Sequence, residues 1–356
     1  MNLDLRARMT VGRLLRRYKE DEPDALRGQA DWCFARGDNA AGLSALLALA
    51  DSQEDPVIAF RLGNCYERGI GVIPNFVNAV RWYERAAAQG GVNAMSRLGD
   101  IYLSGRIVRI GGSVITATES DPAMLGRNRL RPGGMSVPQD FTKAFHWNKA
   151  AAELGDAEAQ ARLGSQFIAG LGTAADAIQA RIWFQASAEQ GCAAGQFGLG
   201  AFYAGAVPGA ADSRKAVDLF EKAAAQGNPL AKLSLALLLI GGQADPVRAA
   251  KLLTEAAEAN NTEAMFRLGE LYRSRGFAGR NLKLAETWLR RAGTRGHTRA
   301  LLGLACLMVE DLAVPDYDSA TIVLREAASR GDLGARRALE QMHSRGDVTR
   351  EAMEKS

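Results

Sequence analysis

The sequence has few of the residues that build metal centres or disulfide frameworks. Its 356 residues include four cysteines and three histidines. Cys33, Cys65, Cys192 and Cys306 lie far apart, and none forms a C-x-x-C pair or a cluster with histidine. We therefore expect no bound metal and no cofactor. Free thiols of this kind favour a reducing, cytoplasmic location.

The sequence also lacks the features expected of a membrane-spanning protein, a nucleic-acid-binding protein or an enzyme. No run of 18 apolar residues is present, so no membrane-spanning helix is expected. The net charge of +4 is small for this length, and we expect no dedicated nucleic-acid binding. His146, His297 and His343 are each isolated and are interpreted as ordinary helix-surface residues. We find no nucleophile–base pair and no paired carboxylates, so the sequence does not indicate an enzyme.

What the sequence has in abundance is one repeated pattern. A leucine, followed by glycine in most copies, recurs with a period near 36 residues and one insertion of 29 residues. The copies are Leu62, Leu98, Leu163, Leu199, Leu235, Leu268 and Leu304, with a degenerate eighth at Leu339. A fixed period in the range of roughly 20–50 residues indicates a solenoid.

The residues around this leucine predict the first helix of each repeat, which we call helix A. A small residue four positions before the leucine and a large one, mostly aromatic, four positions after it place all three on one helical face. The glycine after the leucine leaves room for the close approach of a second helix. A further glycine is expected to end helix A. These glycines are Gly69, Gly105, Gly170, Gly205, Gly241 and Gly276.

The second helix, helix B, starts at an equally regular place. An Asp or Asn precedes its first core alanine by four residues, as expected for a helix N-cap. These residues are Asn75, Asp140, Asp176, Asp212, Asp245, Asn281 and Asp316. Four of the five tryptophans occupy one position of helix B, which favours packing over ligand binding: Trp82, Trp147, Trp183 and Trp288. A Gly or Asn closes each repeat: Gly90, Gly155, Gly191, Gly227, Asn260, Gly296 and Gly331.

From about Ile58 to Gly331 the pattern is A-x-x-x-L-G-x-x-Y-x-x-G followed by D-x-x-x-A-x-x-W-Y-x-x-A-A-x-x-G. It resembles the Sel1-like repeat family, a relative of the tetratricopeptide repeats. The resemblance implies an all-α, right-handed α/α superhelical solenoid of about seven to eight helix-turn-helix repeats. It also implies a non-enzymatic scaffold or adaptor. A secreted branch of the family carries a paired cysteine bridge in each unit, and this chain lacks that pairing.

We expect the solenoid to occupy residues 22–346, beginning with a divergent repeat at Leu26–Glu54 and closing with a lone helix at Asp332–Ser344. Residues 1–21 form a basic, amphipathic arm. It either covers the first repeat or lies on an anionic membrane or a partner through residues 1–19. Residues 347–356 form a charged tail.

The insertion, residues 107–136, lies inside the second full repeat. It is rich in Gly and Pro, which does not favour a helix, although Ser113–Thr118 could form a short strand. Two interpretations stay open: a tolerated surface loop, or a partner-binding element with a basic segment made by Arg127, Arg129 and Arg131.

A variable column on helix A supplies the candidate partner-binding residues. The position before the repeat leucine and the position three residues later share one helical face. Their polar members are Arg61, Asn64, Arg97, Asp100, Arg162, Ser165, Arg267 and Glu270. The column is small or apolar in the fourth and fifth repeats, so it predicts a groove with an apolar middle and basic flanks.

Two explanations of this column compete. Arg97–Asp100 and Arg267–Glu270 have the spacing of local ion pairs on a helix surface. Alternatively, an extended peptide or a partner's helix binds along the groove, with acidic groups near Arg61, Arg97 and Arg162. For the whole protein we expect a protein–protein interaction scaffold. The alternative is a regulator of an envelope or exopolysaccharide enzyme complex, associated with the membrane through residues 1–19.

Overall fold

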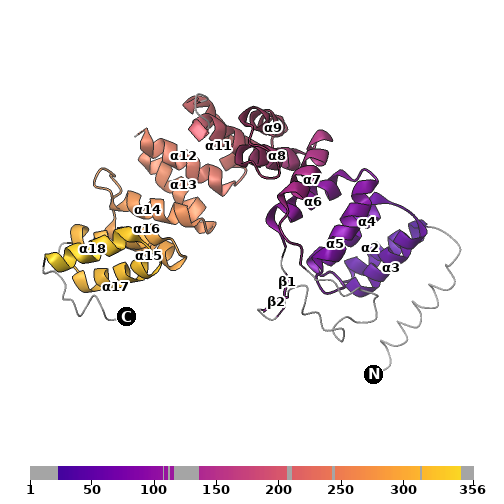
Figure 1. Ribbon diagram of the computed structural model, residues 1–356, viewed down its shortest axis with the longest axis horizontal. Coiled ribbons are helices and arrows are strands. Elements are labelled where there is room, and N and C mark those ends of the chain that lie inside the picture. The colour runs from indigo at the N-terminus through magenta and orange to yellow at the C-terminus, as the bar shows by residue number, and fades with distance from the viewer. Residues whose placement is uncertain are drawn as a thin grey trace, which may run out of the picture. The chain divides into compact units, whose positions relative to one another are not determined.

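The computed structural model describes residues 23–106, 108–110, 113–115, 136–206, 211–242, 245–312 and 315–345. The predicted arm of residues 1–21, the tail of residues 347–356 and most of the insertion lie outside this part. The chain divides into two compact units, residues 1–195 and 196–356, and each is described by itself. The all-α architecture of stacked helix-turn-helix repeats is confirmed in both units (Figure 1).

The first unit consists of four helix pairs and a small strand pair. Each helix A packs against the helix B that follows it. The pairs are α2 (Pro23–Ala35) with α3 (Asn39–Ser52), α4 (Pro56–Arg68) with α5 (Phe76–Ala88), α6 (Val92–Ser104) with α7 (Phe141–Glu153), and α8 (Ala157–Ala169) with α9 (Ala177–Glu189). The first pair is the divergent repeat that the sequence predicts.

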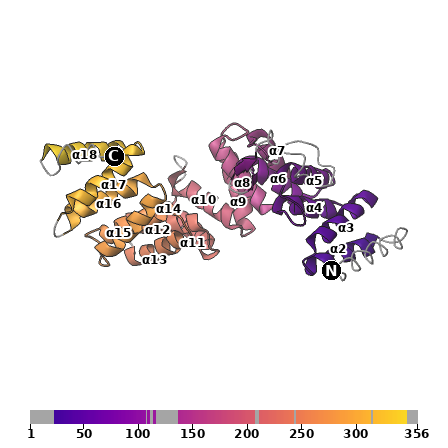
Figure 2. The same ribbon diagram turned by 90° about the horizontal axis from the view of Figure 1, so that it is seen from below.

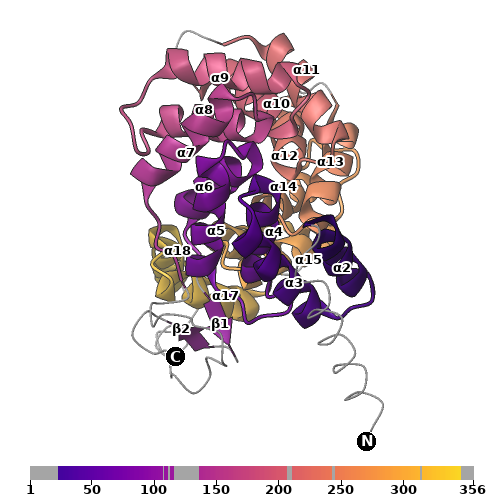
Figure 3. The ribbon, with the colours of Figure 1, turned by 90° about the vertical axis from the view of Figure 1, so that its right-hand side faces the viewer.

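The insertion begins with two short antiparallel strands, β1 (Val108–Ile110) and β2 (Ser113–Ile115). The strand-like run expected from Ser113 is confirmed over its first three residues. At the base of the insertion, the backbones of Arg106 and Val137 exchange two hydrogen bonds of 2.7 and 2.8 Å. In Figures 1 and 3 the strands are drawn below α5 and α6 of the first unit.

Helix α10 (Ala193–Ala201) spans the division, and the second unit repeats the same hairpin. Its elements are the π-helical turn η2 (Phe202–Ala206), α11 (Ser213–Ala225), α12 (Pro229–Gly241), α13 (Pro246–Glu258), α14 (Thr262–Arg273), α15 (Leu282–Thr294), α16 (Thr298–Cys306), the π-helical turn η3 (Leu307–Asp311), α17 (Tyr317–Ser329) and α18 (Leu333–Ser344). Helices α12 to α17 succeed one another as neighbouring pairs, and α18 closes the row (Figure 2). This closing helix is the one that the sequence predicts after Asp332.

The residues predicted to cap helix B and to close each repeat are confirmed at all seven predicted copies. All seven Asp or Asn residues expected at its start accept a hydrogen bond from a backbone N–H of the first turn. All seven residues expected to close a repeat have a positive φ. Asn260, with φ 64°, is the one residue among them that is not glycine.

The predicted ends of helix A are confirmed in the first unit and partly wrong in the second. Gly69, Gly105 and Gly170 follow α4, α6 and α8 with positive φ. In contrast, α12 includes Gly241, and α14 ends earlier, with Ser274 as its cap. Gly205, within the π-helical turn η2, has a positive φ of 102° that breaks the helical run at the predicted position. These helix ends therefore differ in the second unit although the leucine register is kept.

Helices A and B approach each other as closely as predicted, and a helix-B side chain fills the space next to the glycine of helix A. The side chain after the tryptophan position points at the glycine of helix A. A Cβ added at Gly164 would lie 2.7 Å from Phe184 Cδ1, and one at Gly269 would lie 2.6 Å from Leu289 Cγ. Both distances are too short for real contacts, so only glycine permits this packing.

The repeat tryptophans are packing residues, as expected. The four at the shared helix-B position are half-buried and pack against the core of their own unit. The fifth, Trp32, is 56% exposed on α2. The fully buried position is the next one along helix B, which is Tyr83 and Phe220 in two of the repeats.

We predict that Gly164→Ala destabilises the fold by about 1–3 kcal/mol, because the ring of Phe184 must move out of a packed core. Urea unfolding followed by circular dichroism measures the change. Gly28→Ala is the matched control, since no atom lies within 4 Å of a Cβ at that position of α2. The control should stabilise by about 0.5–1 kcal/mol. Equal stability of Gly164→Ala and the wild type would contradict the packing argument.

Candidate functional site

The predicted arginine column forms a continuous row of contacts in the first unit. Each arginine reaches back from its own helix A to the helix A of the preceding repeat. Arg61 pairs with Asp31 on α2, and Arg97 pairs with Glu67 on α4. Arg162 donates to the backbone oxygen of Ser96 on α6 at 3.1 Å. We call Arg61, Arg97, Arg162 and these three partners the arginine ladder.

Glu67 is the most buried acid of the ladder, with 8% of its side chain exposed. Besides its contacts with Arg97, it accepts a hydrogen bond of 2.7 Å from the Tyr83 hydroxyl. Burial alone would raise the pKa of Glu67. The hydrogen bonds from Arg97 and Tyr83, together with the charges of Arg97 and Arg106, hold this pKa below its ordinary value. Burial, and then the bond to Glu67, raise the pKa of Tyr83.

The base of the insertion is tied to the same ladder. Asp100 accepts from Arg97 Nη1 at 2.9 Å and from Arg106 Nη2 at 2.7 Å. Arg106 is also the residue whose backbone pairs with Val137 at the start of the insertion. The local Arg97–Asp100 pair that the sequence suggests is therefore present, and it is part of a larger network.

Arg162 leads into a polar cluster in the core. Its Nε donates to Asn148 Oδ1 at 3.0 Å, and Asn148 Nδ2 donates to Gln166 Oε1 at 2.8 Å. Asn148 and Gln166 are fully buried. Burial lowers the pKa of Arg162, and the nearby charges of Asp100 and Asp156 oppose this shift.

This buried amide pair occupies two positions that carry aliphatic or aromatic side chains in most other repeats. Asn148 stands where helix B elsewhere carries Tyr83, Phe184, Phe220, Leu253, Leu289 and Leu324. Gln166 stands where helix A elsewhere carries Cys65, Ile101, Phe202, Leu238, Leu271 and Leu307. Sequence reasoning missed the cluster because it followed the tryptophan position. Comparison of the next position across repeats would have found it.

The remaining candidate residues are placed differently. Asn64 is half-buried and accepts from the Tyr83 hydroxyl at 3.2 Å. Ser165 is exposed and donates to the Ala161 backbone oxygen at 3.1 Å. Arg127, Arg129 and Arg131 lie outside the described residues.

The suggested Arg267–Glu270 ion pair is wrong. Arg267 Nε bonds Glu263 Oε1 one turn earlier at 2.6 Å, while Glu270 pairs with Arg273 at 3.0 Å. The side chains prefer these partners, which are also three or four residues away. The two candidates therefore belong to separate contacts on α14.

His297 is also not the ordinary surface residue that its sequence context suggests. It caps α16 through Nδ1, which accepts from the Ala300 N–H at 3.2 Å. Its Nε2 lies 2.8 Å from Glu263 Oε2, and its ring stacks on Phe266. The tautomer that satisfies both bonds carries its proton on Nε2. His297 thus joins two repeats, whereas His146 and His343 are exposed.

Within the described residues, no group of three or more His, Cys, Asp or Glu side chains is arranged to hold a metal ion. The four cysteines are unpaired, and burial raises the pKa of Cys33, Cys65 and Cys306. None of the helices that the structure describes is long and apolar enough to cross a bilayer.

These features define a helical-repeat protein in which side chains of neighbouring hairpins form hydrogen bonds and ion pairs with one another. A model of the Sel1 repeat matches residues 58–91, 92–110, 123–156, 157–192, 193–228, 230–261 and 262–297. The matches cover more than half of the chain, which therefore belongs to the Sel1 repeat family. The break after residue 110 falls in the predicted insertion. The hairpins α2–α3 and α16–α17 lie outside the matched residues but have the same helix-pair arrangement.

Known proteins support the fold. A solved structure of c5321, a protective antigen of uropathogenic Escherichia coli with an SLR fold, is 27% identical and has a TM-score of 0.70; the match covers 91% of this chain and 65% of that one. A Sel1 repeat protein from Oxalobacter formigenes is 22% identical with a TM-score of 0.58, covering 75% of this chain and 99% of that one. Thus less than two thirds of the c5321 chain is matched.

Curated relatives match over a short stretch. DAP3-binding cell death enhancer 1 of Mus musculus is 34% identical over 96 residues, which are 26% of this chain and 18% of that protein. The Rattus norvegicus protein of the same name is 32% identical over 93 residues, 25% of this chain and again 18% of the relative. The chain thus spans less than a fifth of these relatives. Repeat folds of this kind generally serve as scaffolds for protein–protein interaction.

We predict that Glu67 stabilises the first unit in a pH-dependent way. Its pKa in the folded chain lies below the unfolded value of about 4.3. Its contribution is therefore complete above that value and is lost as the pH falls through the folded pKa. Urea midpoints of wild type and Glu67→Gln should differ at pH 7, and the difference should shrink as the pH falls below about 4.3. A constant difference across this range would contradict the interpretation.

We predict that Asn148 and Gln166 are energetically coupled. Asn148→Leu should lower the free energy of unfolding by about 1–3 kcal/mol, because Gln166 Oε1 loses its donor and Arg162 Nε loses its acceptor. Adding Gln166→Leu gives an apolar pair, as in most other repeats, and should recover part of that loss. A double-mutant cycle in urea measures the coupling. Additive changes would show that the two amides act independently.

Proposed function

We propose that this chain is a non-enzymatic scaffold that binds a protein partner on the helix-A face of the first unit, formed by α2, α4 and α6. The observation that carries the proposal is that two arginines on this face, and a third just after α6, are paired and yet open to solvent. Arg61, Arg97 and Arg106 keep 31%, 36% and 29% of their side chains exposed. A carboxylate from a partner can therefore reach each guanidinium.

The internal ion pairs favour this face over an ordinary charged surface. An exposed arginine loses side-chain entropy when it is fixed by a partner, which weakens surface ion pairs. Here Glu67 and Asp100 already hold Arg97 from two sides, so that loss is largely complete before binding. A preorganised guanidinium row suits an acidic segment, either an extended peptide or one face of a helix.

The other candidates take different roles in this proposal. Arg162 positions the ladder from within, because its bonds go to Ser96 and Asn148. Ser165 is exposed next to it and is available for contact. Arg267 remains a candidate of the second unit, where its side chain is 41% exposed. A contribution from Arg127, Arg129 and Arg131 stays a prediction from the sequence.

Site-specific cross-linking tests the proposed face. The photo-reactive residue p-benzoylphenylalanine replaces Arg61 on α4 in the full-length chain, which is then irradiated in cells. We expect a discrete cross-linked product with a second protein, and Arg97→Gln introduced into the same chain should weaken it because the guanidinium row is broken.

The matched control replaces Arg81, an exposed arginine on helix B of the same hairpin. Cross-linking at Arg81 should give no such product. The same product in equal yield from both positions, or from Arg81 alone, would reject the helix-A face as the binding surface. Thermal unfolding of each variant excludes loss of the fold as the cause.

A further inference from the structure

A second charged surface lies in the second unit, and neither the arginine ladder nor the repeat pattern explains it. Between Arg273 and Arg299 the sequence has eight basic residues and a single acidic one, Glu286, in a chain whose net charge is only +4. The basic residues are Arg273, Arg275, Arg280, Lys283, Arg290, Arg291, Arg295 and Arg299.

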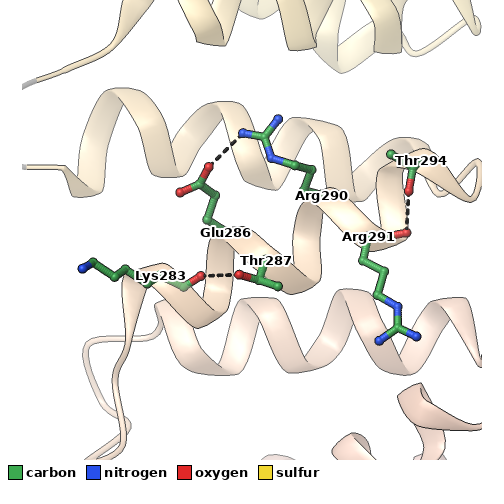
Figure 4. Close-up of a pocket in the computed structure, with 6 residues that line it drawn as sticks. All are labelled: Lys283, Glu286, Thr287, Arg290, Arg291 and Thr294. Carbon is green, nitrogen blue, oxygen red and sulfur yellow. Dashed lines mark hydrogen bonds and ion pairs between the residues drawn. The ribbon is translucent and has the colours of Figure 1, made fainter.

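Helix α15 gathers several of these side chains on its outer side. Lys283, Glu286, Thr287, Arg290, Arg291 and Thr294 line an open cavity of about 500 Å³ along the helix (Figure 4). The opposite side of α15 carries Ala285, Leu289, Ala292 and Gly293, which are buried in the core. One side of the helix is therefore buried in the core, and the other side is charged and takes no part in core packing.

The charges of this cavity are incompletely balanced. Glu286 pairs with Arg290 at 2.8 Å. The Arg291 guanidinium lies 5.2 Å from the centre of the Trp288 ring. Among the residues that the structure describes, no carboxylate forms an ion pair with Lys283 or Arg291.

We propose that this surface of Lys283, Arg290 and Arg291, the α15 cationic face, is a docking site for an acidic segment of a partner protein. Lys283 and Arg291 are eight residues apart, which corresponds to about 12 Å along the helix. Carboxylates spaced by roughly four residues of an extended chain match this distance. The Glu286–Arg290 pair is exposed, so its rearrangement on binding costs little.

The chemistry of the cavity favours a protein over a nucleic acid. Binding of a single strand combines basic groups with aromatic rings on which the bases stack. The lining residues include no aromatic side chain, and the neighbouring Trp288 is half-buried against the core. The polar lining likewise does not suit an apolar helix.

Binding of a fluorescein-labelled decaglutamate peptide to the full-length protein tests the proposal, with fluorescence anisotropy as the readout at low and physiological salt. Lys283→Gln combined with Arg291→Gln should weaken binding about three- to tenfold, since two surface charge contacts are lost. Lys283→Glu alone, which disturbs no ring contact, should also weaken binding. The affinity of the wild type should fall as salt rises.

The matched control, Lys222→Gln with Lys251→Gln, removes two exposed charges from α11 and α13 and changes the net charge equally. It should alter affinity less than about twofold, within the small effect of an unrelated surface charge. Equal weakening by both double variants would mean non-local attraction and would overturn the site. Tighter binding of a labelled oligothymidylate that depends on the same residues would overturn the choice of a protein partner.

Discussion

The contact on which the rest of the structure depends is the meeting of helix B with the glycine of helix A. At Gly164 the Phe184 ring occupies the space that a Cβ would need, and Leu289 does the same at Gly269. This contact sets how closely the two helices approach. The alanines around it are fully buried. The positions outside this packed core are free to carry charge.

The freed positions are used in two different ways. In the first unit, charges on helix A bond across repeats, so the ladder stabilises the stack while staying partly open. In the second unit, helix α15 has cations that no described carboxylate balances. The guanidinium groups of the first surface are thus already held by internal acids, whereas Lys283 and Arg291 form no ion pair with a described carboxylate. The two proposed binding surfaces therefore differ in how far their charges are compensated within the protein.

The sequence predicted the fold well because its signals are local and repeated. Each helix-B cap depends on one Asp or Asn, and each repeat closes on one residue with positive φ, so seven copies support the same assignment. The ends of helix A were harder to predict in the second unit. α14 is capped by Ser274 and α12 continues through Gly241, so these two helices end without a glycine at the predicted position. A glycine in register permits a helix end but does not require it.

The candidate site was less predictable because its bonds join residues far apart in the sequence. The column correctly placed Arg61, Arg97 and Arg162 along one side. It did not identify Glu67, which lies 30 residues before Arg97 and holds it. It paired Arg267 with Glu270, although an arginine in a helix can choose an acid on either side. Choices among near-equal partners are decided by rotamers, which a pattern of residue types does not contain.

The buried amide pair shows that the repeat tolerates a change of chemistry when both partners change. Asn148 alone among aliphatic side chains would leave its polar atoms unsatisfied. Gln166 at the facing position supplies the missing bond, and Arg162 supplies a second one, so the core stays closed while becoming polar. Because Arg162 also bonds Ser96, the interior of this repeat is connected to the exposed ladder. The position of Arg162 in the ladder is thus set by a buried amide on a different helix, which couples core packing to the surface that we propose for partner binding.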